Sequence, residues 1–292
     1  LKPVKPLTVE AGVGVHLWQP RDSEEAEHRK PAVVADPRLG VVLRARPELA
    51  FRVAAGRRTR FPTLKEIYTT QLGYLVPNPD LRPEHAWTVD AGVSIEPWQR
   101  HLELGITGYG AFVEDLIERT YDEDGNRTYT NIRKSRHLGV EVRLVVRPAA
   151  WLELEGGYDG MHARDTTADV EGTRLEYRPE HRARFRGHVA TPFGLRANVV
   201  FTVVGQRHYV AVETTGELEP LPAYVRLDAS LSQELGKGFS VYVRGTNLTD
   251  THYEEQVGFP RPGIEVLGGV QFRGSVPVSQ ISSADLTLGG QR

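Results

Sequence analysis

The sequence of 292 residues contains no cysteine. Disulfides, thiolate metal sites and cysteine nucleophiles are therefore excluded together. The sequence also lacks any apolar run approaching the roughly 18 residues that a membrane-spanning helix requires, and its mean hydropathy is -0.38. The formal net charge of -2 provides none of the basic excess that is typical of nucleic-acid-binding domains. We therefore expect neither bundled membrane helices nor a nucleic-acid partner.

Motifs for catalysis and for metal binding are missing as well. The ten histidines form no HExxH pattern or comparably spaced cluster, and the sequence contains no GxSxG element. Gly105, Gly108 and Gly110 lie along a strand-like segment instead of opening a helix, which argues against dinucleotide binding. We predict no catalytic residue, no metal site and no cofactor, and hence a protein that is not an enzyme.

Alternating apolar and polar residues dominate the sequence. In the first such segment Leu7, Val9, Ala11 and Val13 alternate with polar or small residues, as expected for a strand with two different faces. The pattern recurs in about twelve segments and predicts an all-β protein. The predicted strands span residues 7–17, 39–45, 49–55, 87–95, 102–112, 138–146, 152–158, 183–189, 195–203, 223–231, 239–243 and 264–272.

Each predicted strand has one apolar and one polar face. The alternation places these residues on the outward, apolar face: Val9, Val13, Val93, Ile106, Val142, Val199, Leu227 and Val241. It places these on the opposite face, which would line the lumen of a barrel: Arg52, Asp90, Glu141, Arg143, Arg184, Asp228 and Arg244. Counting back from the turn at Pro148 puts Arg143 roughly opposite Glu155, a plausible cross-strand ion pair.

The connections alternate between tight turns and long polar loops. Tight turns are expected near residues 46–48, 97–100, 148–150, 192–194 and 234–238, and long loops at 18–37, 57–86, 114–136, 160–181, 205–222 and 246–263. Short turns at one end and long loops at the other are typical of an antiparallel up-and-down transmembrane β-barrel embedded in a lipid bilayer. A soluble β-sandwich also alternates. The positions of Trp18, Trp87, Trp98 and Trp151 at strand ends favour the barrel, because interfacial aromatic girdles lie there.

Four segments resemble landmarks of the TonB-dependent receptor barrel, in the family's order. They are RFPTLKEIY at residues 60–68, NPDLRPE at 78–84, YTNI at 129–132 with GVE at 139–141, and NLTD at 247–250 followed by Tyr253. The resemblance implies that residues 1–273 form barrel strands, as part of a parent barrel of about 22 strands. It implies a location in the outer membrane of a Gram-negative bacterium.

The resemblance also implies a function and partners. Family members transport scarce nutrient complexes, of the ferric siderophore or cobalamin class, and are assembled by the barrel assembly machinery. A TonB-type energy-coupling protein acts on them through a plug domain, of which this sequence has no complete counterpart. Loop aromatics and cations are the expected ligand-binding residues, and we nominate Tyr121, Tyr129, Arg133, Arg207, His208 and Tyr209.

The C-terminal segment departs from the family pattern. After Phe272 and Arg273 the sequence continues through residues 274–292, where PVSQIS at 277–282 resembles the start of a plug domain. The alternative is a tail without a role in the barrel.

Closure of the sheet is the remaining question. An open sheet, whose first and last strands do not pair, is expected if the chain supplies part of a wider barrel. The alternatives are a passive pore of about twelve strands that closes on itself and, less favoured, an outer-membrane barrel enzyme.

Overall fold

The computed structural model describes residues 6–19, 32–68, 75–98, 101–121, 126–167, 174–211 and 218–274. The elements are β1 (Leu7–Trp18), β2 (Ala32–Arg46), β3 (Leu49–Arg60), α1 (Leu64–Tyr68), β4 (Leu75–Val76), β5 (Glu84–Ile95), β6 (Leu102–Tyr121), β7 (Arg127–Ala149), β8 (Leu152–Asp165), β9 (His181–Ala190), β10 (Leu195–Val204), β11 (Arg207–Val210), β12 (Leu218–Leu221), β13 (Tyr224–Gly236), β14 (Phe239–Thr246) and β15 (Glu265–Phe272). The predicted tail at 274–292 lies, apart from Gly274, outside the described residues.

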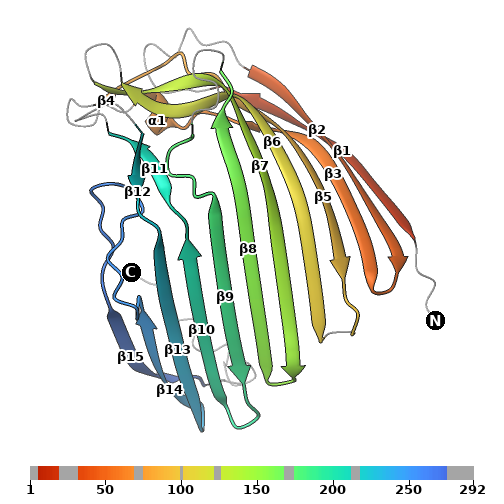
Figure 1. Ribbon diagram of the computed structural model, residues 1–292, viewed down its shortest axis with the longest axis vertical. Coiled ribbons are helices and arrows are strands. Elements are labelled where there is room, and N and C mark those ends of the chain that lie inside the picture. Colours follow the sequence, from red (N-terminus) through yellow and green to blue (C-terminus); the bar gives the residue numbers. More distant parts are fainter. Residues whose placement is uncertain are drawn as a thin grey trace, which may run out of the picture.

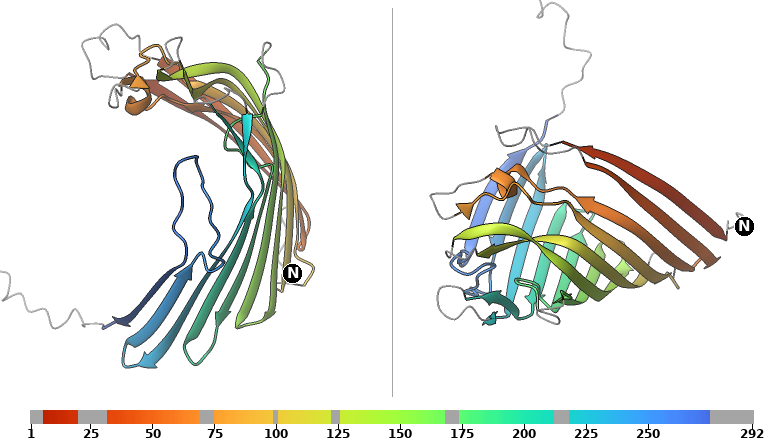
Figure 2. Two further views of the ribbon diagram at one scale, coloured as in Figure 1. Left: turned by 60° about the vertical axis from the view of Figure 1, so that its left-hand side comes forward. Right: turned by 90° about the horizontal axis from the view of Figure 1, so that it is seen from above.

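One large antiparallel sheet makes up most of the structure. Its order is β1-β2-β3-β5-β6-β7-β8-β9-β10-β13-β14-β15, with the short β4 pairing in parallel with β7. The sheet curves into an open trough (Figure 2). Along this path each strand pairs with the next one, and the chain between them contains only the short β4 or the separate β11–β12 hairpin, so the predicted up-and-down meander is confirmed.

The sheet does not close. Among the described strands, β1 and β15 end the strand order and each pairs with a single neighbour, β2 and β14 respectively. This agrees with the predicted open sheet and not with a self-closed barrel.

Tight turns and loops lie at opposite ends of the sheet, as Figure 1 shows. Bulges between Arg44 and Arg46 and between Glu234 and Gly236 shape two of the tight turns. Glycine is required at Gly194 in a third turn, because its φ is +84° and a Cβ there would lie 2.7 Å from the Cβ of Glu234. Helix α1, β4 and the β11–β12 hairpin lie at the loop end.

The strands β6 and β7 are longer than the sequence predicted. Residues 114–136 were expected to form a loop, yet the two strands pair as far as Tyr121 and Arg127. Asp115, with a φ of 57°, interrupts the regular pairing. The extension was missed because apolar and charged residues occur there in adjacent pairs, Leu116 and Ile117 followed by Glu118 and Arg119, which removes the period-two signal.

The strand register fixes which side chains share a face. Cα partners connect Val9 to Val41 and Val53, and further along the sheet Val93 to Ile106 and Val142. Many apolar side chains on this face are exposed, such as Val13 at 65%. Large exposed apolar areas are rare on soluble monomers and mark a surface that meets lipid or another partner.

Trp18 is an exception among the four tryptophans. Trp87, Trp98 and Trp151 are exposed, as expected of a girdle. Trp18 instead stacks on Phe61, with ring centroids 5.4 Å apart and planes at 20°. Its position at a strand end was read correctly, but its ring packs against protein. Among the described residues, no helix is long and apolar enough to cross a membrane.

Candidate functional site

The polar face of the sheet carries an extended array of charged side chains. The register places on this one face all seven residues nominated for the lumen, namely Arg52, Asp90, Glu141, Arg143, Arg184, Asp228 and Arg244. Several charges pair across or along strands. Arg52 Nη2 lies 3.2 Å from Asp90 Oδ2, and Arg226 Nη2 lies 3.0 Å from Asp228 Oδ2.

Arg143 and Glu155 form the predicted ion pair, at 3.1 Å between Nε and Oε1. Their relation is diagonal and not opposite, because Arg143 pairs with Gly157 and Glu155 with Val145 in the register. The offset arises because the turn lies at Ala150 and Trp151, with Ala149 paired to Leu152, and not at Pro148. Glu155 also accepts from Arg186 at 3.2 Å, so one carboxylate serves two guanidinium groups.

The first three family-like segments meet at the loop end in one cluster. Ile67 from α1, Leu81 from the NPDLRPE segment and Ile117 from β6 are 0%, 1% and 7% exposed and pack together. Trp18, Tyr68 and Tyr129 cover them. We call these six residues the rim cluster. Burial of its apolar side chains holds together segments that are distant in the sequence.

Hydrogen bonds organise the start of α1 beside the rim cluster. Glu66 accepts from the Thr63 amide at 2.8 Å, and the Glu66 amide donates to Thr63 Oγ1 at 3.3 Å, which is a capping box. Burial raises the pKa of Glu66, but the Thr63 and Arg60 hydrogen bonds outweigh it, so the net pKa lies below the ordinary value.

Glu84 connects the rim cluster to the sheet. This carboxylate is 8% exposed. It accepts from Arg60 Nε at 2.7 Å and from the Ile117 amide at 2.7 Å. Both carboxylate oxygens of Glu84 therefore accept hydrogen bonds, as a buried charged group requires.

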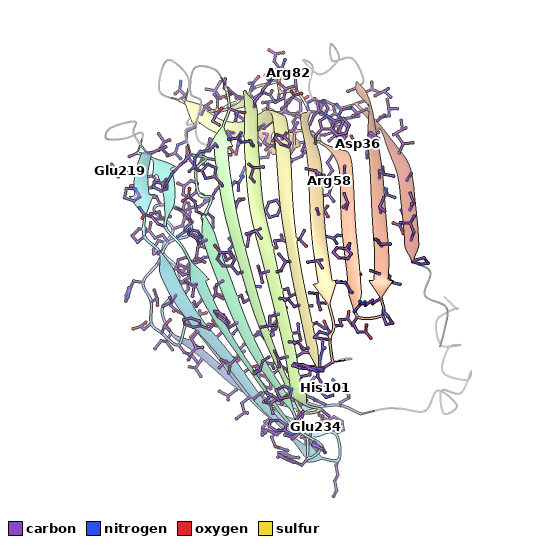
Figure 3. All side chains as sticks on the ribbon, turned by 45° about the vertical axis from the view of Figure 1, so that its right-hand side comes forward. Asp36, Arg58, Arg82, His101, Glu219 and Glu234 are labelled. Carbon is purple, nitrogen blue, oxygen red and sulfur yellow. The ribbon has the colours of Figure 1, made fainter. Side chains whose placement is uncertain are left out.

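Asparagines fix the NPDLRPE segment to β7. Asn78 Nδ2 donates to the Tyr129 carbonyl at 2.8 Å. Asn131 accepts from the Arg82 amide at 2.9 Å and donates to the Arg82 carbonyl at 3.0 Å. Arg82 also pairs with Asp115 and lies at the loop end (Figure 3). These motif residues thus hold the NPDLRPE segment against β7.

Asn247 plays a similar part in the NLTD segment. Asn247 is buried, with 3% of the residue exposed. Nδ2 donates to the carbonyls of Thr251 and Pro262, both at 3.0 Å, while Oδ1 accepts from the Thr251 amide at 3.1 Å. Thr249 Oγ1 donates to the same oxygen at 3.2 Å. The φ of Asn247 is 50°, a left-handed conformation that Asn tolerates better than most residues.

Aromatic stacking connects the loop at residues 247–262 to the first residue of β13. Tyr253 stacks on Tyr224 with centroids 4.1 Å apart. Arg207 is 4% exposed, lies 5.3 Å from the Tyr224 ring centroid and donates to the carbonyls of Glu254 and Glu255 at 2.8 and 3.1 Å. Sequence reasoning did not find this use of Arg207, because its partners Glu254 and Glu255 lie more than 40 residues away. It did not find that of Asn247 either, although Thr249 and Thr251 lie close in the chain.

The six nominated ligand-binding residues occupy different environments. The side chains of Tyr121 and Arg133 lie outside the described residues. Tyr129 belongs to the rim cluster, where it packs against the buried residues. Arg207 is buried as described above. His208 contacts Arg174, 3.1 Å between Nε2 and Nη1, and Tyr209 donates to Glu219 at 2.7 Å. Burial, then the Arg174 charge, lower the pKa of His208, which favours the neutral ring.

Comparison with known protein families gives a match over most of the chain. A family model described as TonB dependent receptor-like, beta-barrel, matches residues 12–248. None of the curated protein sequences gives a match.

Three solved structures illustrate the similarity of fold. The ferric-catecholate import receptor Fiu from E. coli K12 has a TM-score of 0.66 at 15% identity, covering 91% of this chain and 42% of the receptor. The copper transporter OprC has a TM-score of 0.71 at 16% identity, covering 92% and 45%. FpvA of P. aeruginosa, bound to an iron–pyoverdine complex, has a TM-score of 0.70 at 13% identity, covering 93% and 37%. This chain spans less than half of the length of each.

Proposed function

The chain belongs to the TonB-dependent receptor β-barrel family, and from this premise we propose that it forms barrel wall of an outer-membrane transporter in a Gram-negative bacterium. The proposed cargo is a scarce nutrient complex of the ferric siderophore or cobalamin class. Fiu is a ferric-catecholate import receptor, OprC is a copper transporter and FpvA binds an iron–pyoverdine complex, which supports transport of metal complexes.

The observation that carries the proposal is the division of the sheet into two unlike faces. One face is apolar and exposed, with Val9 at 58%, Phe51 at 43% and Val199 at 44%. The other carries the ion-paired array that includes Arg52, Asp90 and Arg143. A bilayer on the apolar side and a wet lumen on the charged side satisfy both faces.

The proposed partners follow from the family. The apolar face contacts outer-membrane lipid, and the barrel assembly machinery inserts the strands. A TonB-type energy-coupling protein acts through a plug domain. Capture of the complex takes place at the loop end, where we propose Tyr121, Tyr129, Arg133, His208 and Tyr209 as contacts. Arg207, which is buried and donates to the carbonyls of Glu254 and Glu255, would hold this loop in place instead.

Uptake measurements in cells test the proposal. Deletion of the coding region for this chain should abolish accumulation of at least one radiolabelled ferric siderophore or cobalamin under nutrient limitation, and a plasmid copy should restore it. Dissipation of the inner-membrane proton gradient should have the same effect as deletion, because the proposed transport depends on energy coupling.

Two results would contradict the proposal. Unchanged uptake of all iron and cobalamin complexes in the deletion strain would exclude the transport role. Uptake that depends on the chain but persists without a proton gradient would instead favour a passive pore.

A further inference from the structure

Arginine and aromatic side chains share one register row at the loop end of the apolar face. The Cα partners across five neighbouring strands, from β3 to β8, are Arg57, Trp87, Phe112, Arg136 and Arg164. An isolated antiparallel bridge adds Arg174 beside Arg164. We call these six residues the border row. Arg136 lies six residues from Val142 on β7, and because alternate residues of a strand share a face, the row belongs to the apolar face.

The border row lies at the height where the hydrocarbon of a bilayer would end. On β7 the apolar face runs from Val146 to Leu138, and Arg136 is the next residue on that face. The ten residues from Val146 to Arg136 cover about 34 Å of strand at about 3.4 Å per residue. For a strand tilted by about 40° this is roughly 26 Å of height, close to the apolar band of about 25 Å in outer-membrane barrels. The guanidinium groups of the row would therefore lie at the level of the lipid headgroups.

The aromatic members of the row agree with this position. Trp87 and Phe112 are 51% and 47% exposed, and Phe112 is the Cα partner of both Trp87 and Arg136. Tryptophan is enriched at the boundary between hydrocarbon and headgroups. The row thus combines an apolar surface for the start of an acyl chain with cations for the headgroup above it.

The opposite border of the apolar face has a different composition. Near the tight turns one register row across the same strands and β9 consists of Leu49, Ile95, Leu104, Leu144, Gly156 and Phe185. This row contains no charged residue. Long cationic side chains that only reach for water would be expected at both borders of an apolar belt. Their presence in the border row alone indicates a group that is found in one leaflet.

The acids around the border row balance only part of its charge. Arg136, Arg164 and Arg174 follow one another across the strands, and like charges directly opposite destabilise a sheet. Glu180 accepts from Arg164 Nη2 at 2.8 Å and lies 3.6 Å from Arg174 Nη2. Arg136 is exposed and, within the described part of the chain, has neither a hydrogen bond nor an ion pair. An anion over β7 would therefore be stabilised by Arg136.

Lys134 adds a cation next to Arg136 on the side away from the apolar belt. The two residues lie two positions apart on β7, about 7 Å along the strand. Lys134 is 60% exposed, and its Nζ lies 3.8 Å from Oε1 of Glu114, which is 59% exposed. An exposed pair at this distance contributes little, so Lys134 is available to a stronger anionic partner.

We propose that Arg136 and Lys134 bind the anionic phosphate of a lipid headgroup in the leaflet at the loop end of the sheet. Trp87 and Phe112 contact the same lipid where its acyl chains begin. Guanidinium N–H groups match phosphate oxygens in geometry and charge, and cations beside a membrane attract anionic headgroups. The inference rests on the proposed placement of the apolar face in a bilayer, but it depends on no particular cargo.

Lipid retention by the full chain in a neutral detergent tests the proposal. The chain is incubated with radiolabelled phosphatidic acid, or with phosphatidylcholine of the same acyl chains, whose phosphate is balanced by choline. Ionic strength is held constant because salt screens exposed charges. The wild type should retain at least fivefold more phosphatidic acid than phosphatidylcholine. Arg136→Gln should reduce this preference at least threefold, whereas Arg136→Lys should keep most of it.

Arg244→Gln is the matched control. Arg244 is exposed on the charged face of β14 and has no ion pair among the described residues, so this variant removes the same charge away from the border row and should keep the wild-type preference. Glu114→Gln should increase the preference, because it removes the negative charge beside Lys134, and a folding defect would not produce such a gain. Excess inorganic phosphate at the same ionic strength should leave the lipid bound, since the acyl chains add to its affinity.

Three results would overturn the proposal alone. They are equal retention of the two lipids by the wild type, equal losses in the Arg136→Gln and Arg244→Gln variants, and displacement of the lipid by inorganic phosphate. Retention of neither lipid would overturn both this inference and the placement of the apolar face in a bilayer, on which the proposed function depends.

Discussion

Asn247 should determine the stability of the loop at residues 247–262. Its side chain makes two donor and two acceptor hydrogen bonds, and Asn247→Ala removes all four. With a net contribution of roughly 0.5–1.5 kcal/mol for each bond, the four bonds contribute about 2–6 kcal/mol, and we take about 3 kcal/mol because three of them are to near neighbours in the chain. Alanine at a φ of 50° adds about 1 kcal/mol of backbone strain. We expect a total of about 4 kcal/mol, close to a thousandfold in a local equilibrium.

Hydrogen exchange of the Thr251 and Leu248 amides measures this local equilibrium. Both amides are hydrogen bonded, to Asn247 Oδ1 and to the Leu227 carbonyl, and both should lose protection in Asn247→Ala. Asn247→Gly removes the same side-chain bonds without the strain, so its loss should be smaller by about 1 kcal/mol. Thr246→Ala removes a single exposed hydrogen bond to Glu265 and serves as the control. A loss of protection below threefold in Asn247→Ala would refute the reasoning.

Three other perturbations test the rim cluster and the two faces. Ile67→Ala should destabilise the rim by about 3 kcal/mol in urea unfolding, because Ile67 is 0% exposed, whereas Leu64→Ala on the same helix should cost little because Leu64 is 54% exposed. Val142→Arg should weaken folding into lipid vesicles by roughly 2–4 kcal/mol, whereas Glu141→Arg on the opposite face should fold normally. Equal effects of these two variants would contradict the assignment of the faces. Since the pKa of Glu66 is depressed in the folded state, its stabilisation is present above the unfolded-state pKa of about 4.5 and disappears as pH falls through the lower folded-state value. Exchange of the Ile67 amide, corrected for the intrinsic rate, should therefore show a smaller acid-induced loss of protection in Glu66→Gln than in the wild type.

Strand number and side-chain direction followed from the sequence because both depend on local alternation. The large sheet holds thirteen strands, of which β4 lies off the path, so the path contains the twelve that alternation predicts. Strand length was less predictable. In the outer part of β6, two adjacent apolar residues, Leu116 and Ile117, are followed by two adjacent charged residues, Glu118 and Arg119, so the period-two alternation that marks a strand is lost there.

The roles of the family-like motifs could not be derived from sequence. Resemblance identified NPDLRPE and NLTD, but Glu84 and Asn247 act through partners that the fold brings in from residues 60 and 117 or from 251 and 262. Short-range signals existed for Thr63 and Glu66, whose spacing of three residues is that of a capping box, and for Asn247, which bonds Thr249 and Thr251 within four residues. For Arg207 the sequence suggested a role that the structure does not support. A loop arginine was expected to bind the ligand, but its guanidinium donates to the carbonyls of Glu254 and Glu255.

The two edge strands of the sheet, β1 and β15, lack the lysine and proline that commonly protect a sheet edge. Isolated sheet edges are commonly protected by lysine, proline or inward-pointing charge. Neither β1, LTVEAGVGVHLW, nor β15, EVLGGVQF, contains lysine or proline. Both instead maintain the apolar face, with Leu17 at 72% and Val270 at 68% exposed. Strands of this composition aggregate when their edges meet water, whereas lipid on one face and a neighbouring strand along the edge satisfy both the side chains and the backbone. We therefore expect the edges of β1 and β15 to pair with further strands in the membrane, which is the arrangement that an open, two-faced sheet requires.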